Sequence, residues 1–389
     1  MRKNVFPKTL ARRGKISYMS DHDTRDKRPP KADQRDGAPS RQPVRGARSA
    51  RAAVFACAIL LIGAAALAIL ARKVPGFGDF YASNIYPVWQ GSLGRIAGII
   101  PFSLSEAILY ALPVLLIIDI IVNRKRLLRV VKHLAVLASA LAVLYSANCG
   151  VNYYRTSFSR TEGLDRVEPS SELLIGFCEY TAEKLIGEGG AEADLTDLGE
   201  RAVGAMSSLG DRYPTLSGFY PEPKPILNSE PFSSMGVTGI YSPFTIEANY
   251  NRDITPYNLP FTACHELSHL KGYMNEKEAN YIGWLACISS DDSYFNHSGW
   301  MMAWVYAGNA LAAEDRDAFL VLRSSLPDSV ISELEENNAF WREHETKASE
   351  VQDKVNDAYL KANGQENGVV DYGLVVDLML SWYSSEILH

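Results

Sequence analysis

The chain has 389 residues, 47% of them hydrophobic and 22% charged, which is ample for one sizeable folded domain and additional segments. Its net charge of −6 hides a strong asymmetry: residues 1–51 carry 15 Lys and Arg against 5 Asp and Glu, whereas residues 151–389 carry 16 against 37. The acidic C-terminal part therefore excludes nucleic acid as a partner. Five cysteines without a CxxC motif or a paired framework exclude a disulfide scaffold.

The first 51 residues are rich in Pro, Gly, Ser and Gln and show almost no periodic apolar pattern. Such a segment cannot bury enough apolar surface to offset the conformational entropy of its chain. We expect it to be a disordered basic tail on the cytoplasmic side of a membrane.

Three apolar segments follow, at about residues 52–71, 104–122 and 130–149. The first has twenty residues without a charge, which is long enough to cross about 30 Å of hydrocarbon. It is longer than the apolar region of a cleaved signal peptide, so we interpret it as a retained anchor. The second contains Glu106 and Asp119 near its ends and the third is short, so buried helices of a soluble domain are the alternative for these two.

Basic residues are concentrated in the loop 123–133, whereas the segment 72–103 contains only three. The positive-inside rule places such a basic loop, and with it the N-terminus, in the cytoplasm. We therefore predict a membrane domain with three transmembrane helices over residues 52–150 and an extracytoplasmic domain over residues 151–389. The segment 72–103 is expected to be an interfacial loop whose aromatic side chains lie at headgroup level.

The sequence His-Glu-x-x-His occupies residues 265–269. On an α-helix, residues four apart project from one face, so His265 and His269 can bind a single tetrahedral Zn²⁺. Glu266 then stands where a general base can take a proton from water activated by the metal. A catalytic zinc has three protein ligands and an open position, so the motif lacks one ligand. A helix with ordinary surface or core histidines is the alternative interpretation.

Two glutamates downstream of the motif are candidates for the third ligand. Gly272 is expected to end the first helix and Asn275 to cap a second, which doubles back over residues 276–285. Glu276 and Glu278 are two positions apart and point about 200° away from each other around that helix. Only one of them can therefore face the metal.

The remaining C-terminal region predicts an α+β fold that is mostly helical and has a small β-sheet. Helical periodicity predicts helices at about residues 169–187, 197–209 and 331–358. Residues 214–234 are rich in Pro and Ser and are expected to form a surface loop. Residues 235–251 are β-branched and aromatic, which predicts one or two strands before the motif helix.

Three parts of this region could take part in catalysis. Residues 235–251 could supply an edge strand that pairs with extended substrate, or they could form only a structural hairpin. His297 could donate a hydrogen bond to an oxyanion, although a single histidine is more often structural. Tyr372, at the start of an apolar C-terminal helix, could do the same.

The run Glu276-Lys277-Glu278-Ala279-Asn280 resembles the Glu-x-x-Ala-Asn/Asp pattern of gluzincin-type metallopeptidases. This resemblance implies that Glu276 is the third zinc ligand, with Glu278 as the alternative, and that Asn280 orients a motif histidine from the second shell. The connection between the motif and the glutamate is shorter here than in most of those families.

The three apolar segments, the motif with Gly272, the segment Tyr241–Thr245 and the C-terminal Tyr372–Leu378 together resemble a bacterial membrane family known as domain of unknown function 3810. The likeness runs from about residue 52 to the end of the chain. The family resembles membrane-anchored zinc metallopeptidases without an established substrate. It implies a zincin-like extracytoplasmic domain in which an active-site helix pair lies beside a small β-sheet.

These observations favour a multi-pass protein of the cytoplasmic membrane that contacts the lipid bilayer, binds zinc and hydrolyses a peptide or protein substrate. Two other functions stay open. One is a non-catalytic envelope protein in which a metal only joins two helices. The other is a sensor that relays events outside the membrane to the basic tail.

Overall fold

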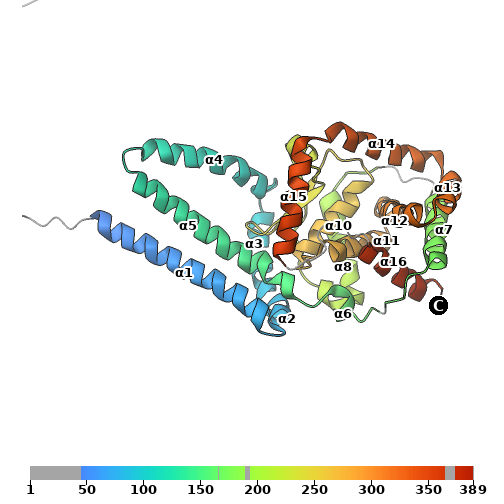
Figure 1. Ribbon diagram of the computed structural model, residues 1–389, viewed down its shortest axis with the longest axis horizontal. Helices are drawn as coiled ribbons and strands as arrows, with labels where there is room; N and C mark the ends of the chain where they lie inside the picture. Colours follow the sequence, from blue (N-terminus) through green and yellow to red (C-terminus); the bar gives the residue numbers. More distant parts are fainter. Residues whose placement is uncertain (1–44, 165, 189–192, 364–372, 389) are drawn as a thin grey trace, which may run out of the picture. The chain divides into compact units, whose positions relative to one another are not determined.

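The computed structural model describes residues 45–388 except 165, 189–192 and 364–372 (Figure 1). Of the expected disordered tail, residues 1–44 lie outside the described residues, and residues 45–51 are helical rather than disordered. The described part is mostly helical and contains one three-stranded sheet, which confirms the prediction of a mostly helical fold with a small β-sheet.

Three helices near the N-terminus are long and apolar enough to cross a membrane: α1 (Arg45–Lys73), α4 (Leu104–Val122) and α5 (Leu127–Tyr145). A π-helical turn (Ser146–Gly150) and a 3-10 turn (Asn152–Tyr154) continue α5. The protein buries only 6%, 6% and 11% of the three apolar windows, so their surfaces are left uncovered. Figure 1 shows these helices extending together away from the remaining helices. The three predicted apolar spans are confirmed, with bounds that differ by a few residues.

The expectation of a loop at residues 72–103 is wrong. The segment is mostly helical, with α2 (Phe77–Phe80), a π-helical turn (Tyr81–Ile85) and α3 (Tyr86–Gly98). Its glycines suggested a loop, but Gly91, Gly94 and Gly98 all lie within α3. A Cβ atom on Gly94 would lie at ordinary contact distance, 3.5 to 3.7 Å, from side chains of the C-terminal domain, so α3 packs directly on that domain.

One face of α3 is joined to the C-terminal domain by buried hydrogen bonds. The Tyr86 hydroxyl donates to the carbonyl oxygen of Leu270 at 2.8 Å and lies 2.9 Å from the Tyr241 hydroxyl. The Gln90 amide donates to the carbonyl oxygen of Phe219 at 3.0 Å. The segment before α4 therefore packs as part of the same folded unit as residues beyond 150.

The sheet consists of β1 (Lys224–Ile226), β2 (Gly239–Ser242) and β3 (Glu247–Asn251) in the order β1-β3-β2. β1 is parallel to β3, whereas β2 is antiparallel to it, with Ser242 opposite Glu247. The two predicted strands within 235–251 are confirmed, and β2 lies at an edge of the sheet. β1 lies within residues 214–234, which were expected to form a surface loop. The sequence did not indicate this strand, because three residues with a central proline carry no alternating pattern.

The helices of the C-terminal domain pack around a central pair. The central pair is α10 (Asn258–Leu270) and α11 (Glu276–Ile288), and its main helical neighbours are α8 (Leu198–Arg212), α12 (Ser293–Glu314) and α16 (Gly373–Glu386). α7 (Ser171–Glu188) packs mainly on α12. The other described helices are α6 (Phe158–Thr161), α9 (Glu230–Ser233), α13 (Arg316–Ser325), α14 (Asp328–His344) and α15 (Lys347–Ala362), and Pro214–Leu216 forms a 3-10 turn. Two predicted helices correspond to α7 and α8, and the predicted charged helix is divided into α14 and α15. Trp284 of α11 is fully buried among aromatic rings from α7, α12 and α16.

The first turn of α4 is held on the sheet by two carboxylates. Glu247 of β3 forms a buried ion pair with Lys224 of β1 at 2.7 Å and accepts the backbone N–H groups of Leu104 and Ser105 at 3.1 and 2.8 Å. Glu106 accepts the N–H groups of residues 227 and 228, both at 2.8 Å. Glu106, which argued against a membrane span at residues 104–122, therefore lies at the start of α4, where it accepts hydrogen bonds from the backbone. Carboxylates are favourable there, because the first N–H groups of a helix have no partner within the helix.

The Lys224–Glu247 pair should contribute strongly to stability. Burial alone would raise the pKa of Glu247, but Lys224 and the hydroxyl and N–H donors around it lower that pKa. Lys224→Met should lower the free energy of unfolding by about 3–5 kcal/mol, because it leaves a buried carboxylate without its cation. Chemical denaturation of the purified protein in detergent measures the change.

The exposed pair of Arg252 and Asp253, 3.8 Å apart, provides the control for this prediction. Arg252→Met should change the unfolding free energy by less than about 1 kcal/mol. Equal effects of the two substitutions would contradict the importance of the buried pair. The lowered pKa of Glu247 also means that its contribution is present above the ordinary glutamate range and is lost as the pH falls through the lowered value.

Candidate metal centre

The motif helix and the helix that follows it are joined by a tight turn at residues 271–275. Gly272 adopts a φ of +91°, and the N–H groups of Gly272 and Tyr273 donate to the carbonyl oxygens of His269 and Ser268. This left-handed ending closes α10 and reverses the chain. The Asn275 side chain then accepts the N–H groups of residues 277 and 278 and caps α11. Both helix ends lie where the sequence predicts them.

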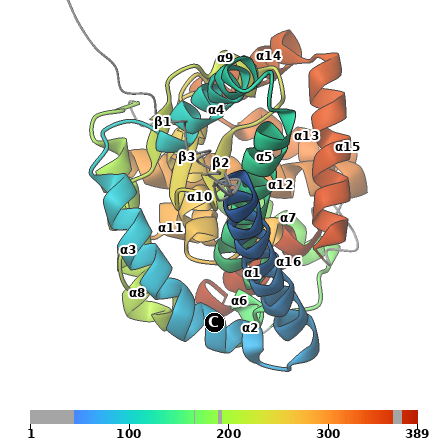
Figure 2. The same cartoon turned by 90° about the vertical axis from the view of Figure 1, so that its left-hand side faces the viewer.

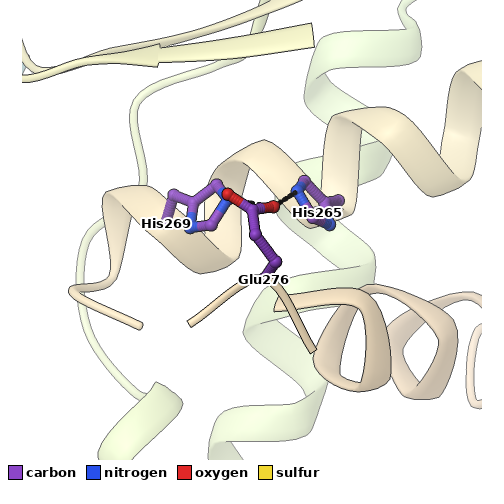
Figure 3. Close-up of side chains that lie close together, drawn as sticks. All are labelled: His265, His269 and Glu276. Carbon is purple, nitrogen blue, oxygen red and sulfur yellow. Dashed lines mark ion pairs between the residues drawn. The ribbon is translucent and has the colours of Figure 1, made fainter. Parts of the chain in front are cut away.

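This turn brings His265, His269 and Glu276 together (Figure 3). The Nε2 atoms of His265 and His269 each lie 3.4 Å from Oε2 of Glu276, and the two rings are nearly perpendicular, edge to face, with centroids 4.6 Å apart. Two ligand atoms that bind one tetrahedral zinc at about 2.1 Å lie roughly 3.4 Å from each other. A direct N–H to O hydrogen bond is shorter, at about 2.7–3.2 Å. The spacing and the donor set therefore fit a shared metal ion better than a hydrogen-bonded ion pair.

The charges of the cluster suit metal binding as well. Burial would raise the pKa of Glu276, but the neighbouring His269 and His265 rings hold it well below its ordinary value. A metal ligand must be deprotonated, so this environment keeps the carboxylate in its binding form. The Glu276 side chain is 40% exposed, whereas the histidines are 13% and 11% exposed. Of the three side chains, Glu276 is therefore the one that reaches solvent most.

Each motif histidine has a different environment at its second ring nitrogen. Nδ1 of His269 lies 2.8 Å from the carbonyl oxygen of Tyr273, which favours a proton on Nδ1 and leaves Nε2 free as a ligand. Nδ1 of His265 is buried and has no hydrogen-bond partner among the residues that the structure describes. Asn280, the predicted orienting residue, is half-buried, and its side chain makes no hydrogen bond within the described part of the chain. A backbone carbonyl instead orients the second histidine.

Glu266 lies beside the cluster in a nearly closed environment. Its side chain is 3% exposed, and its Oε2 atom has no hydrogen-bond partner within the described residues. Burial raises the pKa of Glu266 to about 7, although His265 and His269 lower it in part. A carboxyl group of this kind can take up and release a proton near neutral pH.

The edge strand β2 crosses directly over this carboxylate. A Cβ atom on Gly239 would lie 2.6 Å from Oε1 of Glu266 and 2.8 Å from Cγ2 of Thr262. Only glycine therefore allows the strand to approach α10 so closely. The backbone N–H of Tyr241, two residues further along β2, also lowers the pKa of Glu266. It therefore lies near the same carboxylate.

The other predicted site residues lie apart from this cluster. Oε1 of Glu278 accepts the backbone N–H of Phe158 at 2.6 Å, and its side chain is buried. His297 of α12 is fully buried and lies 2.8 Å from Glu333 of α14. Tyr372 lies outside the described residues, so its predicted role stays a prediction. Of the two candidate third ligands, only Glu276 joins the histidines.

Sequence reasoning missed two contributors to the site. Gly239 and the Tyr241 N–H contact Glu266 through the backbone, and the Tyr86 hydroxyl holds the end of α10 from a segment expected to be a loop. An isolated glycine inside a predicted strand often marks a close approach of another group, which was the available signal for Gly239. Nothing in the sequence indicated the partner of Tyr86, because that contact joins residues 184 positions apart.

Comparison with known proteins gave one match. The family described as protein of unknown function (DUF3810) matches residues 81–380, which excludes α1 and includes α3, the sheet and the motif helices. The match therefore begins later than residue 52, where the sequence resemblance was expected to start. Searches of curated proteins and of solved structures returned no match. Because the match covers most of the chain, the protein belongs to the DUF3810 family.

Proposed function

We propose that this protein is a membrane-anchored zinc peptidase. The observation that carries the proposal is the spacing of His265, His269 and Glu276, whose ligand atoms all lie within 4.8 Å of one another. In the described part of the chain they form a cluster of three candidate ligands, which is the number of protein ligands at a catalytic zinc. A structural zinc would be closed by a fourth protein ligand.

The surrounding residues supply what peptide hydrolysis needs. Zinc, when bound, polarises a carbonyl group and makes water more acidic. Glu266 accepts the proton of that water and returns it to the leaving amine, which its pKa of about 7 suits. The backbone of β2 is in position to pair with an extended substrate beside Glu266, because β2 lies at the sheet edge.

We further propose that the metal centre lies outside the cytoplasm. The end of α1, the start of α4 and the end of α5 are the ends that contact the C-terminal domain, through Arg72, Ser105 and Asn148 respectively. The basic loop after α4 is at the other end of these helices (Figure 1). The positive-inside rule then assigns that loop to the cytoplasm and the metal centre to the opposite side.

Zinc binding should depend on Glu276 and not on its near neighbour. Wild-type protein should bind one zinc ion, and Glu276→Gln should weaken binding by more than about 100-fold, beyond the 10–100-fold typical for loss of an orienting partner. Glu278→Gln is the matched control, because its amide oxygen can still accept the N–H of Phe158. Isothermal titration and metal analysis measure both. Equal zinc affinities for the two variants would reject Glu276 as a ligand.

Peptide cleavage should require Glu266. Glu266→Gln should lower kcat by about 10²–10⁴-fold while zinc affinity stays near that of the wild type, because the residue transfers protons and does not hold the metal. Gly239→Ala should give a smaller loss, since the added methyl group displaces the carboxylate without removing it. Mass spectrometry of a randomised peptide library measures cleavage. Residual activity equal to the wild type in Glu266→Gln would remove the peptidase proposal.

The orientation predicts which end of the chain is accessible. In right-side-out membrane vesicles, an added protease should remove a tag placed after His389 and leave a tag placed before Met1 intact. Detergent-permeabilised vesicles, in which both tags are cleaved, provide the control. Protection of the C-terminal tag in sealed vesicles would reverse the proposed topology.

A further inference from the structure

α3 has an apolar face that the protein leaves uncovered. The opposite face, with Tyr86 and Gln90, is buried against the domain. Two polar residues lie on the uncovered side: Ser92, whose hydroxyl donates to the carbonyl oxygen of Val88 at 2.6 Å, and Arg95, which is exposed and whose guanidinium lies 4.1 Å from the centroid of the Phe219 ring. The side chains of this α3 apolar face are between 42% and 81% exposed: Val88, Trp89, Ile96 and Ile99.

The position of α3 in the chain identifies what covers this face. α1 ends at Lys73 shortly before α3, and α4 begins at Leu104 shortly after it. Both helices are long and apolar enough to span a bilayer, so the ends that flank α3 lie at one membrane surface. Figure 2 shows α3 beside the spans, reaching from α2 towards α4. The α3 apolar face therefore continues the apolar surface of the spans, as in a helix that lies at the boundary of headgroups and acyl chains.

Hydrogen bonds connect the metal centre to α3 and to the spans. Tyr86 of α3 binds the carbonyl oxygen of Leu270, one residue after His269. The turn after β2 contacts the spans themselves: the hydroxyls of Ser105 and Thr245 are 2.6 Å apart, and the amide of Asn148 donates to the carbonyl oxygen at position 243 at 2.8 Å. One end of β2 therefore lies at the first turn of α4.

The other end of β2 lies over Glu266, through Gly239. Gly239 and Ser242 are the two ends of the strand and are three residues apart, which corresponds to about 10 Å of extended chain. Glu266, beside the metal centre, is therefore separated from the start of α4 by about 10 Å measured along β2. The strand and its turn also expose two apolar side chains, Ile240 at 44% and Phe244 at 42%.

We propose that the substrate is a membrane-tethered polypeptide, cut within a few residues of the point where it leaves the bilayer. This inference rests on the proposed peptidase function and names the substrate class of the same site. A chain emerging from the bilayer reaches β2 after about three or four extended residues. Its first residues outside the membrane are often apolar or aromatic and match the exposed side chains of β2. A soluble peptide lacks the high local concentration that tethering provides.

The test uses the full-length protein reconstituted with zinc in phosphatidylcholine–phosphatidylglycerol vesicles. One randomised peptide segment is presented in three forms: fused directly to a transmembrane helix, raised by about 30 Å on a rigid helical spacer of about 20 residues, and free in solution. Directly tethered peptide should be cleaved at least about tenfold faster than the other two forms, because only it stays at the height of β2. Mass spectrometry measures the cleavage rates and positions.

A second comparison tests the lipid contact of α3. Val88→Glu with Ile96→Glu should lower cleavage of the directly tethered peptide several-fold and leave cleavage of the free peptide unchanged, because charge on the α3 apolar face lifts the site from the bilayer. Val321→Glu, at a 68% exposed position on α13, is the control and should change neither rate.

The outcomes separate this inference from the proposed function. Equal cleavage of the tethered, raised and free peptides would overturn the substrate class and leave the peptidase intact. Faster cleavage of the raised or free peptide would overturn it as well. No cleavage of any form by zinc-loaded wild type would overturn the peptidase proposal and, with it, this inference.

Discussion

The reversal of the chain at Gly272 is the constraint on which the metal centre depends. A left-handed glycine ends α10 one turn after His269, and Asn275 starts α11 immediately afterwards. This short connection leaves Glu276 in the first turn of α11, facing the histidines of α10. A longer connection would allow α11 to slide along α10 and would separate the three side chains. The turn also accounts for His269, whose ring is oriented by the carbonyl oxygen of Tyr273 in the same turn.

The carboxylates around the sheet and the candidate metal centre differ in their protonation because their partners differ. Glu247 is surrounded by a lysine and by the first N–H groups of α4, so it stays charged and connects the sheet to the spans. Glu276 is held in its charged form by two imidazoles. For Glu266, burial outweighs the two imidazoles and the N–H of Tyr241 and raises its pKa to about 7. Glu278 accepts a backbone N–H of the segment after the third span. One residue type thus serves as anchor, ligand candidate, proposed proton carrier and structural acceptor.

The edge strand β2 is fixed between the apolar helices and the candidate metal centre. β2 is held at one end by the first turn of α4 and by Asn148, and at the other by its contact with Glu266. Ile246, in the turn between β2 and β3, has a φ of +54°, which is an unfavourable conformation for a β-branched residue. Its side chain is fully buried and packs against α3. Packing against α3 therefore outweighs local backbone preference at this position.

Local patterns alone determined three parts of the structure, because each depends on neighbouring residues. Uninterrupted apolar length determined the three apolar helices, and helix-capping residues determined the motif helix with its turn and second helix. The β-branched composition determined the β2–β3 hairpin. The choice of Glu276 over Glu278 was anticipated only by resemblance, and the tertiary structure decided their positions by giving Glu278 the N–H of Phe158. The helical state of residues 77–98, the short strand β1 and the approach of Gly239 to Glu266 came from tertiary structure alone. Their partners lie up to 184 positions away in the chain, and no local pattern records a contact over that separation.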